Sequence, residues 1–192
     1  PAALGGAVAA FMNPGGVRNP GFAFAGVTYP YDVTYGNAFT VQPFGNSLVT
    51  LTLTAAQIKT VLEQQFSGCL GQTANRVMQI SASLNYSWSA TGTCGTRIQN
   101  VTLTPVDVSA GYPVVTGPAE PIVTAGVVVS SNSYRVTVNN FMATGGDGFT
   151  TFIGGLSQQG GAHDIDALGA YLASFKSPAA PYSPTNAALA KP

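Results

Sequence analysis

The stretch SLVTLTLTAAQIKTVLEQQF, residues 47–66, decides the class of fold. Its first eight residues are rich in leucine, valine and threonine, which is typical of a β-strand. Residues Ala55–Phe66 favour a helix, and an apolar residue recurs at every fourth position: Ile58, Leu62 and Phe66. Thr54 stands where a helix N-cap is expected, because its hydroxyl can accept a bond from an unpaired backbone N–H. Gly68 is expected to end the helix. The stretch therefore predicts a strand that is followed directly by a helix.

The rest of the chain predicts further elements of both kinds. Four segments have the apolar runs or alternation of strands: Ala7–Met12, Val77–Trp88, residues 98–103 and Ser133–Asn139. A second helix is predicted over Asp164–Phe175, with apolar residues at a period of 3.6 and aspartates in its first turn. The proline- and glycine-rich segments 19–34 and 105–126 are expected to be irregular. Strands and helices mixed without regular alternation indicate an α+β fold, with mixed sheets and flanking helices.

The composition excludes several classes of protein. The chain has 192 residues, of which 45% are hydrophobic and 7% charged, and its formal net charge is zero. Nucleic-acid binding needs a basic patch that displaces counterions from phosphates, so this class is disfavoured. Disorder is disfavoured by the apolar content, and no apolar run is long enough to predict a membrane span. Because the chain starts at Pro1 without a signal peptide, we expect a mature or trimmed piece.

Two cysteines, Cys69 and Cys94, permit one disulfide, and two buried free thiols are the alternative. The low charge and the many small polar residues are typical of exported proteins, which favours the disulfide. If it forms, the bridge closes a loop of about 26 residues and contributes on the order of 3 kcal/mol.

Several familiar kinds of catalytic site find no support. The single histidine, His163, precedes the second predicted helix and is interpreted as a surface loop residue. One histidine and two cysteines 25 residues apart do not form a zinc motif. The acidic residues are scattered, so no catalytic carboxylate pair is indicated. Asn85 and Asn100 each begin a glycosylation pattern, which has meaning only in a eukaryotic secretory pathway.

Two glycine-rich turns are more informative, Asn13–Arg18 and Asn139–Phe149. Each taken alone is ordinary turn chemistry, and the second has too few acidic residues for a calcium loop. Together with residues 42–46 they supply two loop phenylalanines, a carboxylate, an amide and an arginine. Aromatic rings stack on nucleobases, and a carboxylate accepts bonds from two neighbouring hydroxyls. The combination therefore predicts a nucleoside site.

Three motifs in this order resemble the C-terminal domain of the 5'-nucleotidase family: FMNPGGVR (11–18), VTYGNAFTVQPFGNSLVTLTLTAAQIKTVLEQQF (33–66) and YRVTVNNFMATGGDGF (134–149). The family includes ecto-5'-nucleotidases and bacterial periplasmic UDP-sugar hydrolases. The resemblance runs from about Ala7 to Pro178. It implies one substrate-binding domain over residues 1–178, with a truncated start, and a proline-rich tail over 179–192.

The resemblance also implies roles for individual residues. Phe44 and Phe141 match the two rings that sandwich the nucleobase, and Asp147 matches the acceptor of the ribose hydroxyls. Asn13 and Arg18 match polar contacts on the base and phosphate side. Four glycines match turns in which the backbone approaches the ligand closely: Gly15, Gly16, Gly145 and Gly146.

The implied function is to hold the base and ribose of a nucleoside monophosphate for hydrolysis. In the family, two divalent metal ions and the catalytic His–Asp pair lie on a separate N-terminal metallophosphatase domain, so no catalytic residue and no metal site are expected in this chain. The alternatives are the same role in a 2',3'-cyclic-nucleotide phosphodiesterase/3'-nucleotidase or a UDP-sugar hydrolase, or a binding module without catalysis. The implied location is periplasmic or secreted.

Some features depart from the family pattern. The chain starts too late to carry the arginines that grip phosphate before the first glycine-rich turn. Residues 19–34 form a longer segment than the family usually has there. The cysteine pair and residues 105–126 are not family hallmarks, which leaves the substrate preference open.

Overall fold

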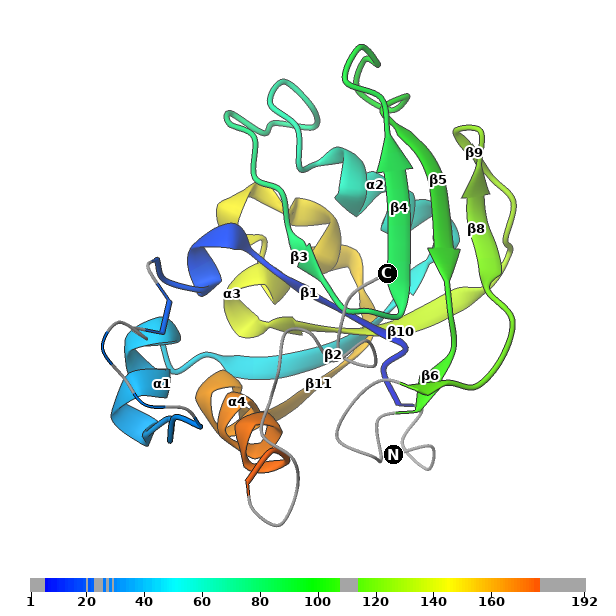
Figure 1. Cartoon of the computed structure of the whole chain (residues 1–192). Helices are drawn as coiled ribbons and strands as arrows, with labels where there is room; N and C mark the ends of the chain where they lie inside the picture. The colour runs from blue at the N-terminus through cyan, green and yellow to red at the C-terminus, as the bar shows by residue number, and fades with distance from the viewer. Residues whose placement is uncertain are drawn as a thin grey trace.

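The computed structural model describes residues 6–19, 21–22, 26, 28, 30–107 and 114–176, whose strands form two larger sheets and one short ladder (Figure 1). The five-stranded sheet contains, in spatial order, β11 (Leu156–His163), β2 (Ser47–Thr54), β10 (Ser133–Asn139), β1 (Ala9–Met12) and β3 (Gln79–Ile80). The four-stranded sheet contains β4 (Leu84–Trp88), β5 (Ile98–Leu103), β8 (Glu120–Thr124) and β9 (Val127–Val128). The ladder pairs β6 (Val106–Asp107) with β7 (Val114–Val115). The fold is α+β, as predicted.

The helices are α1 (Tyr35–Val41), α2 (Ala55–Glu63), α3 (Asn140–Ala143) and α4 (Asp164–Ala173), with short 3-10 turns η2 (Pro14–Gly16), η3 (Gly146–Gly148) and η4 (Thr150–Gly154). Figure 1 shows α1 beside α4, at one end of the five-stranded sheet. No helix among the described residues has the length and apolar character needed to cross a membrane.

The topology of the five-stranded sheet brings distant loops to one edge. β1 runs parallel to β10, so the carboxyl ends of these two strands lie side by side. β2 runs antiparallel to β10 and pairs Leu48 with Asn139, which places the beginning of β2 at the same edge. β11 also ends there, because His163 pairs with Ser47. Both glycine-rich turns and residues 42–46 therefore lie close together at this end of the sheet.

The core lies between the two sheets and α2. Leu51 and Leu53 of β2 are fully buried and share one apolar cluster with residues of β4, β5 and β8. α2 adds Ile58, Val61 and Leu62 to this cluster, on the face that the sequence predicts. The Thr54 hydroxyl accepts a bond from the backbone N–H of Gln57, and the Gln57 side chain bonds back to Thr54. The predicted N-cap is confirmed.

α2 ends at Glu63, three residues before the predicted end at Phe66. After Glu63 the chain leaves the helix, because Gln65 forms hydrogen bonds with residues 76 and 78. The carbonyl of Gln65 accepts a bond from the Arg76 backbone N–H, and its side-chain oxygen accepts one from Met78. Phe66 remains buried in this turn. α4 likewise ends at Ala173 rather than at Phe175.

The single strand predicted over Val77–Trp88 is wrong. The segment divides into β3, which pairs with β1, and β4, which pairs with β5 in the other sheet. Two serine hydroxyls mark the break: Ser81 accepts a bond from the Ala10 backbone N–H and bonds to Ser83. Alternation of apolar and polar residues continues through the corner, because both short strands face the same core.

Several elements have no counterpart in the prediction. The segment 105–126, predicted to be irregular, contains β6, β7 and β8, with Ile122 and Val123 of β8 fully or almost fully buried. α1 begins directly after the segment 19–34, and the described part of that segment holds no strand or helix. β11 is exposed along its whole length, so apolar patterning could not reveal it. The predicted tail over 179–192 lies outside the described residues.

A cluster of polar side chains surrounds Glu120, the first residue of β8. The Tyr134 hydroxyl donates to the Glu120 carboxylate, which also accepts bonds from Asn132 and Ser130. The bond from Tyr134 lowers the pKa of Glu120 below its usual 4.5, and burial raises the pKa of Tyr134 above 10.0. Folding therefore favours the charged carboxylate and the neutral phenol.

Candidate functional site

A cavity of about 250 Å³ lies at the sheet edge where β1 and β10 end and β2 begins. It is lined by Asn13, Gly15, Gly16, Arg18, Phe44, Asn46, Phe141 and Asp147. Small-molecule pockets usually measure about 300–1,000 Å³. This cavity thus suits part of a small molecule rather than a whole large one.

The first turn places Asn13 in the cavity wall. η2 begins at Pro14, whose fixed φ suits the start of a helical turn. The Asn13 side chain is 5% exposed and does not cap η2; it points to the second turn instead. Gly16 is required by space, since a Cβ there would lie 2.8 Å from the Asn13 oxygen and 2.5 Å from the Met12 sulfur.

The second turn carries Phe141 on α3 and Asp147 in η3. Asn139 caps α3 by accepting a bond from the Met142 backbone N–H. Gly145 then takes a left-handed φ of 87°, which only glycine adopts without cost. Asp147 has a φ of 55°, a conformation that aspartate tolerates better than most residues.

A chain of side-chain hydrogen bonds joins the two turns. Asn139 donates its amide to the Asn13 oxygen at 3.0 Å, and Asn13 donates its own amide to Asp147 Oδ2 at 2.7 Å. On the other side, Arg76 lies 3.3 Å from Asp147 Oδ1 in an ion pair. The carboxylate is therefore held at both oxygens while it lines the cavity.

Phe44 lies in a loop that is held from three directions. The Asn140 side chain of α3 accepts the Ser47 backbone N–H, and the Asp164 backbone N–H of α4 donates to the Asn46 carbonyl. Arg18 stands over the Phe44 ring, with its guanidinium carbon 4.5 Å from the ring centre. Phe44 is 46% exposed and Phe141 43%, so both rings are available to a flat ligand.

The structure brings most of the predicted contact residues together around one cavity. The exceptions are Gly145 and Gly146, which do not line it. Gly146 instead packs under the Phe141 ring, where an added Cβ would come within 2.5 Å. Asn46 lines the cavity but was not among the predicted contacts, because an amide in a turn carries no distinctive pattern. His163, predicted on a surface loop, ends β11 and lies 3.2 Å from the Gly45 carbonyl.

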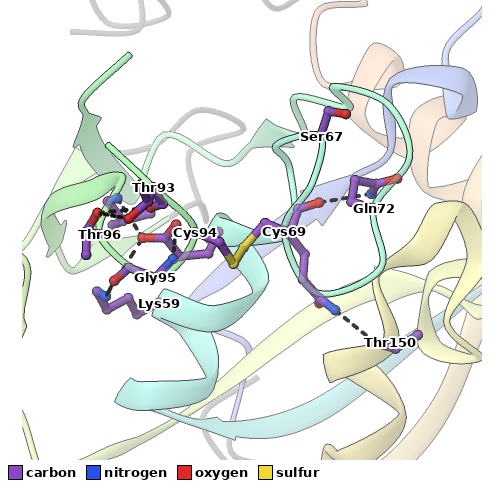
Figure 2. Close-up of a disulfide and its surroundings, with 12 residues drawn as sticks. Lys59, Ser67, Cys69, Gln72, Thr93, Cys94, Gly95, Thr96 and Thr150 are labelled. Atoms are coloured by element: carbon purple, nitrogen blue, oxygen red, sulfur yellow. Dashed lines mark hydrogen bonds and ion pairs between the residues drawn. A yellow bond between two sulfur atoms is a disulfide. The ribbon is translucent and has the colours of Figure 1, made fainter. Parts of the chain in front are cut away.

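The cysteines are joined in a disulfide that links the loop after α2 to the hairpin between β4 and β5 (Figure 2). The buried Glu63 carboxylate accepts the backbone N–H groups of Gly95 and Ile98, and so fixes the hairpin beside Cys94. The part of the chain that the structure describes has no group of three or more histidine, cysteine or acidic residues that could hold a metal ion.

Chemically, the cavity offers two aromatic faces, one carboxylate, amide groups and one guanidinium. Rings stack on any flat heterocycle at about 1–3 kcal/mol per base. A carboxylate accepts hydrogen bonds from two neighbouring hydroxyls, and a guanidinium donates to anionic oxygens.

Comparison with known proteins identifies a matching family and several relatives. Residues 2–153 match the family model described as "5'-nucleotidase, C-terminal domain". A trifunctional nucleotide phosphoesterase protein of Bacillus subtilis is 30% identical over 147 residues, which cover 77% of this chain and 8% of that protein. A cell wall protein of Listeria monocytogenes is 32% identical over 121 residues, 63% of this chain and 13% of that protein.

The crystal structure of a 5'-nucleotidase precursor from Thermus thermophilus has the same fold, with a TM-score of 0.66 and 29% identity. The match covers 91% of this chain and 30% of that one. The chain thus spans less than a third of the length of each of these relatives.

Proposed function

The chain belongs to the family of 5'-nucleotidase C-terminal domains, and from that premise we propose that it binds the base and ribose of a nucleotide for hydrolysis. Family membership rests on the match over residues 2–153. One observation supports the assignment of residues: two segments far apart in sequence supply Phe44, and Phe141 with Asp147, to one cavity.

In this proposal the nucleobase lies between the rings of Phe44 and Phe141, and the ribose hydroxyls donate to Asp147. Arg18, with its guanidinium at the cavity and over the Phe44 ring, faces the phosphate side. The cavity volume of about 250 Å³ supports an arrangement in which only the base and ribose lie in the cavity, because it suits a part of the nucleotide. The phosphate then projects out of the domain.

Hydrolysis itself is proposed to occur on a metallophosphatase domain with two divalent metal ions, as the family resemblance implies. Holding the substrate raises the rate by presenting the phosphate in a fixed orientation. The substrate-binding domain is proposed to extend over residues 1–178. A periplasmic or secreted location is proposed as well; the disulfide and the resemblance to a cell wall protein support it.

A second candidate is the same binding role toward other phosphoesters of nucleotides, such as 3'-nucleotides or 2',3'-cyclic nucleotides. It is favoured by the name of the Bacillus subtilis relative, a trifunctional nucleotide phosphoesterase. Titration of the chain with 3'-AMP and 2',3'-cyclic AMP, compared with 5'-AMP, separates the two candidates by their relative affinities.

Calorimetric titration with adenosine, 5'-AMP and ribose 5-phosphate tests the main proposal. We expect adenosine and 5'-AMP to bind, and ribose 5-phosphate to bind far more weakly, because it lacks a base to stack. Absence of adenosine binding, or equal affinity for ribose 5-phosphate, would contradict the proposal.

A further inference from the structure

The loop between α2 and β3 reaches the carboxylate of the proposed ribose site. Residues 67–76 form a compact loop that is covalently tied through Cys69 to the hairpin of Cys94 (Figure 2). Its backbone closes on itself: the N–H of Gly68 bonds to the carbonyl of Gln72, and the N–H of Gln72 bonds to the carbonyl of Cys69. The loop therefore presents its side chains in fixed positions.

Gln72 is the central side chain of this loop and is 5% exposed. Its Nε2 donates to the carbonyl of Gln64 and to the carbonyl of Asp147, both at 2.9 Å. Its Oε1 accepts a bond from Arg76 Nε at 3.3 Å. One amide thus connects the end of α2, the η3 turn and Arg76.

Arg76 continues the connection to the carboxylate, with Nη1 3.3 Å from Asp147 Oδ1. Asn13 occupies one bonding position of Oδ2. A carboxylate has about four lone-pair positions, so each oxygen retains a position for a ligand hydroxyl. The left-handed backbone of Asp147 is held at the same time by Gln72 on its carbonyl.

We propose that Arg76 and Gln72 are positioning residues that orient Asp147 for the ribose diol and so determine how strongly the site prefers a ribose with this diol over one without it. The inference rests on the proposed function and goes beyond it, because neither residue lines the cavity. They act on the ligand through Asp147: Arg76 fixes Oδ1, and Gln72 fixes the turn that carries the carboxylate. Base stacking does not depend on them.

The test compares adenosine with 2',3'-dideoxyadenosine, which keeps the base and the 5'-hydroxyl and lacks the 2'- and 3'-hydroxyls of the diol. The affinity ratio of the two ligands measures the diol interaction alone. We expect Arg76→Met and Gln72→Met to lower this ratio by about tenfold, the scale of one hydrogen bond to a charged group. Dideoxyadenosine affinity should stay unchanged, and Arg76→Lys, which keeps a cation, should restore part of the ratio.

Arg97→Met is the matched control, because Arg97 stacks on Phe66 near the same disulfide and makes no contact with Asp147 in the structure. It should leave the ratio at the wild-type value. A wild-type ratio in both loop variants would overturn the inference and leave the proposed function standing. Equal weakening of both ligands would also overturn it, since that result indicates a general structural effect. If the wild-type chain binds neither ligand, both proposals fail.

Discussion

Asn13 donates its side-chain amide to the carboxylate of Asp147 at 2.7 Å, across 134 residues of sequence. The donor follows β1 and the acceptor follows α3, and the parallel pairing of β1 with β10 brings the two turns together. Asn13 also accepts a bond from the buried Asn139. The Asn13 side-chain amide therefore connects the two glycine-rich turns to each other and orients the carboxylate that lines the cavity.

Asn13→Ala should lower the free energy of unfolding by about 1–3 kcal/mol, because the Asn139 amide is left buried without its acceptor. It should also weaken adenosine binding, since Asp147 loses one of its two side-chain anchors. Urea unfolding and calorimetric titration measure the two effects. Asn46→Ala is the control for stability, with an expected change in the free energy of unfolding within about 0.5 kcal/mol. An equal loss of unfolding free energy in both variants would contradict the stabilising role of the Asn13 hydrogen bonds.

Phe44→Ala and Phe141→Ala should each weaken adenosine binding by about 1–3 kcal/mol, the range for stacking of one base on an aromatic ring. Both rings are close to half exposed, so stability should change little. Phe39→Ala removes an exposed ring of α1 that does not line the cavity and should leave binding intact. Undiminished affinity in both cavity variants would exclude the base site.

Gly146→Ala should weaken adenosine binding by on the order of 1 kcal/mol, part of the stacking energy of one ring. The added methyl carbon would lie 2.5 Å from the Phe141 ring, so the ring must leave its position. Gly160→Ala is the matched control, because a Cβ at Gly160 meets no atom within 4 Å. Titration should show a loss in the first variant only; an unaffected Gly146→Ala would mean that the ring position is unimportant for the ligand.

Reduction of Cys69–Cys94 should lower the free energy of unfolding by about 3 kcal/mol on the loop-entropy model. Urea unfolding with and without dithiothreitol measures this change. The double variant Cys69→Ser with Cys94→Ser should match the reduced protein and should not respond to dithiothreitol. A wild-type protein insensitive to dithiothreitol under unfolding conditions would argue against the bridge.

The Glu120–Tyr134 cluster predicts two limits on stability with pH. The pKa of Glu120 is lowered in the folded state, so its contribution is present above about pH 4.5 and is lost as the pH falls through the lowered value. The pKa of Tyr134 is raised, so its contribution is present below about pH 10 and is lost as the pH rises through the raised value.

Tyr134→Phe should make the free energy of unfolding depend less on pH in both the acid and the alkaline range. It should also lower stability near neutrality by about 1 kcal/mol, the scale of one buried hydrogen bond. Unfolding free energies between about pH 3 and about pH 11 would show this. Tyr35→Phe, at a tyrosine that is 64% exposed, should leave the profile unchanged. If the two variants have the same profile, the cluster does not set these limits.

Sequence reasoning succeeded where local pattern and structure coincide. β2 and α2 were predictable because a β-rich run meets a capping threonine and an apolar face. Most residues that line the cavity could also be named from the sequence, because they lie in the two glycine-rich turns or in residues 42–46. Arg76 and Gln72 could not be found in this way, because only the folded loop brings them to Asp147. β11 and the break inside 77–88 depend on pairing between distant strands, which local periodicity does not encode.

The pairing of β2 also sets an order for folding. Both neighbours of β2 in the sheet, β10 and β11, come from residue 133 onward. β4 and β5, in contrast, are consecutive strands joined by the hairpin of Cys94. During synthesis this hairpin can form early, while β2 has no partner strand until residues from 133 onward have left the ribosome. Contacts of such long range slow folding, so the leucine-rich face of β2 stays without its partner strand until β10 is synthesised.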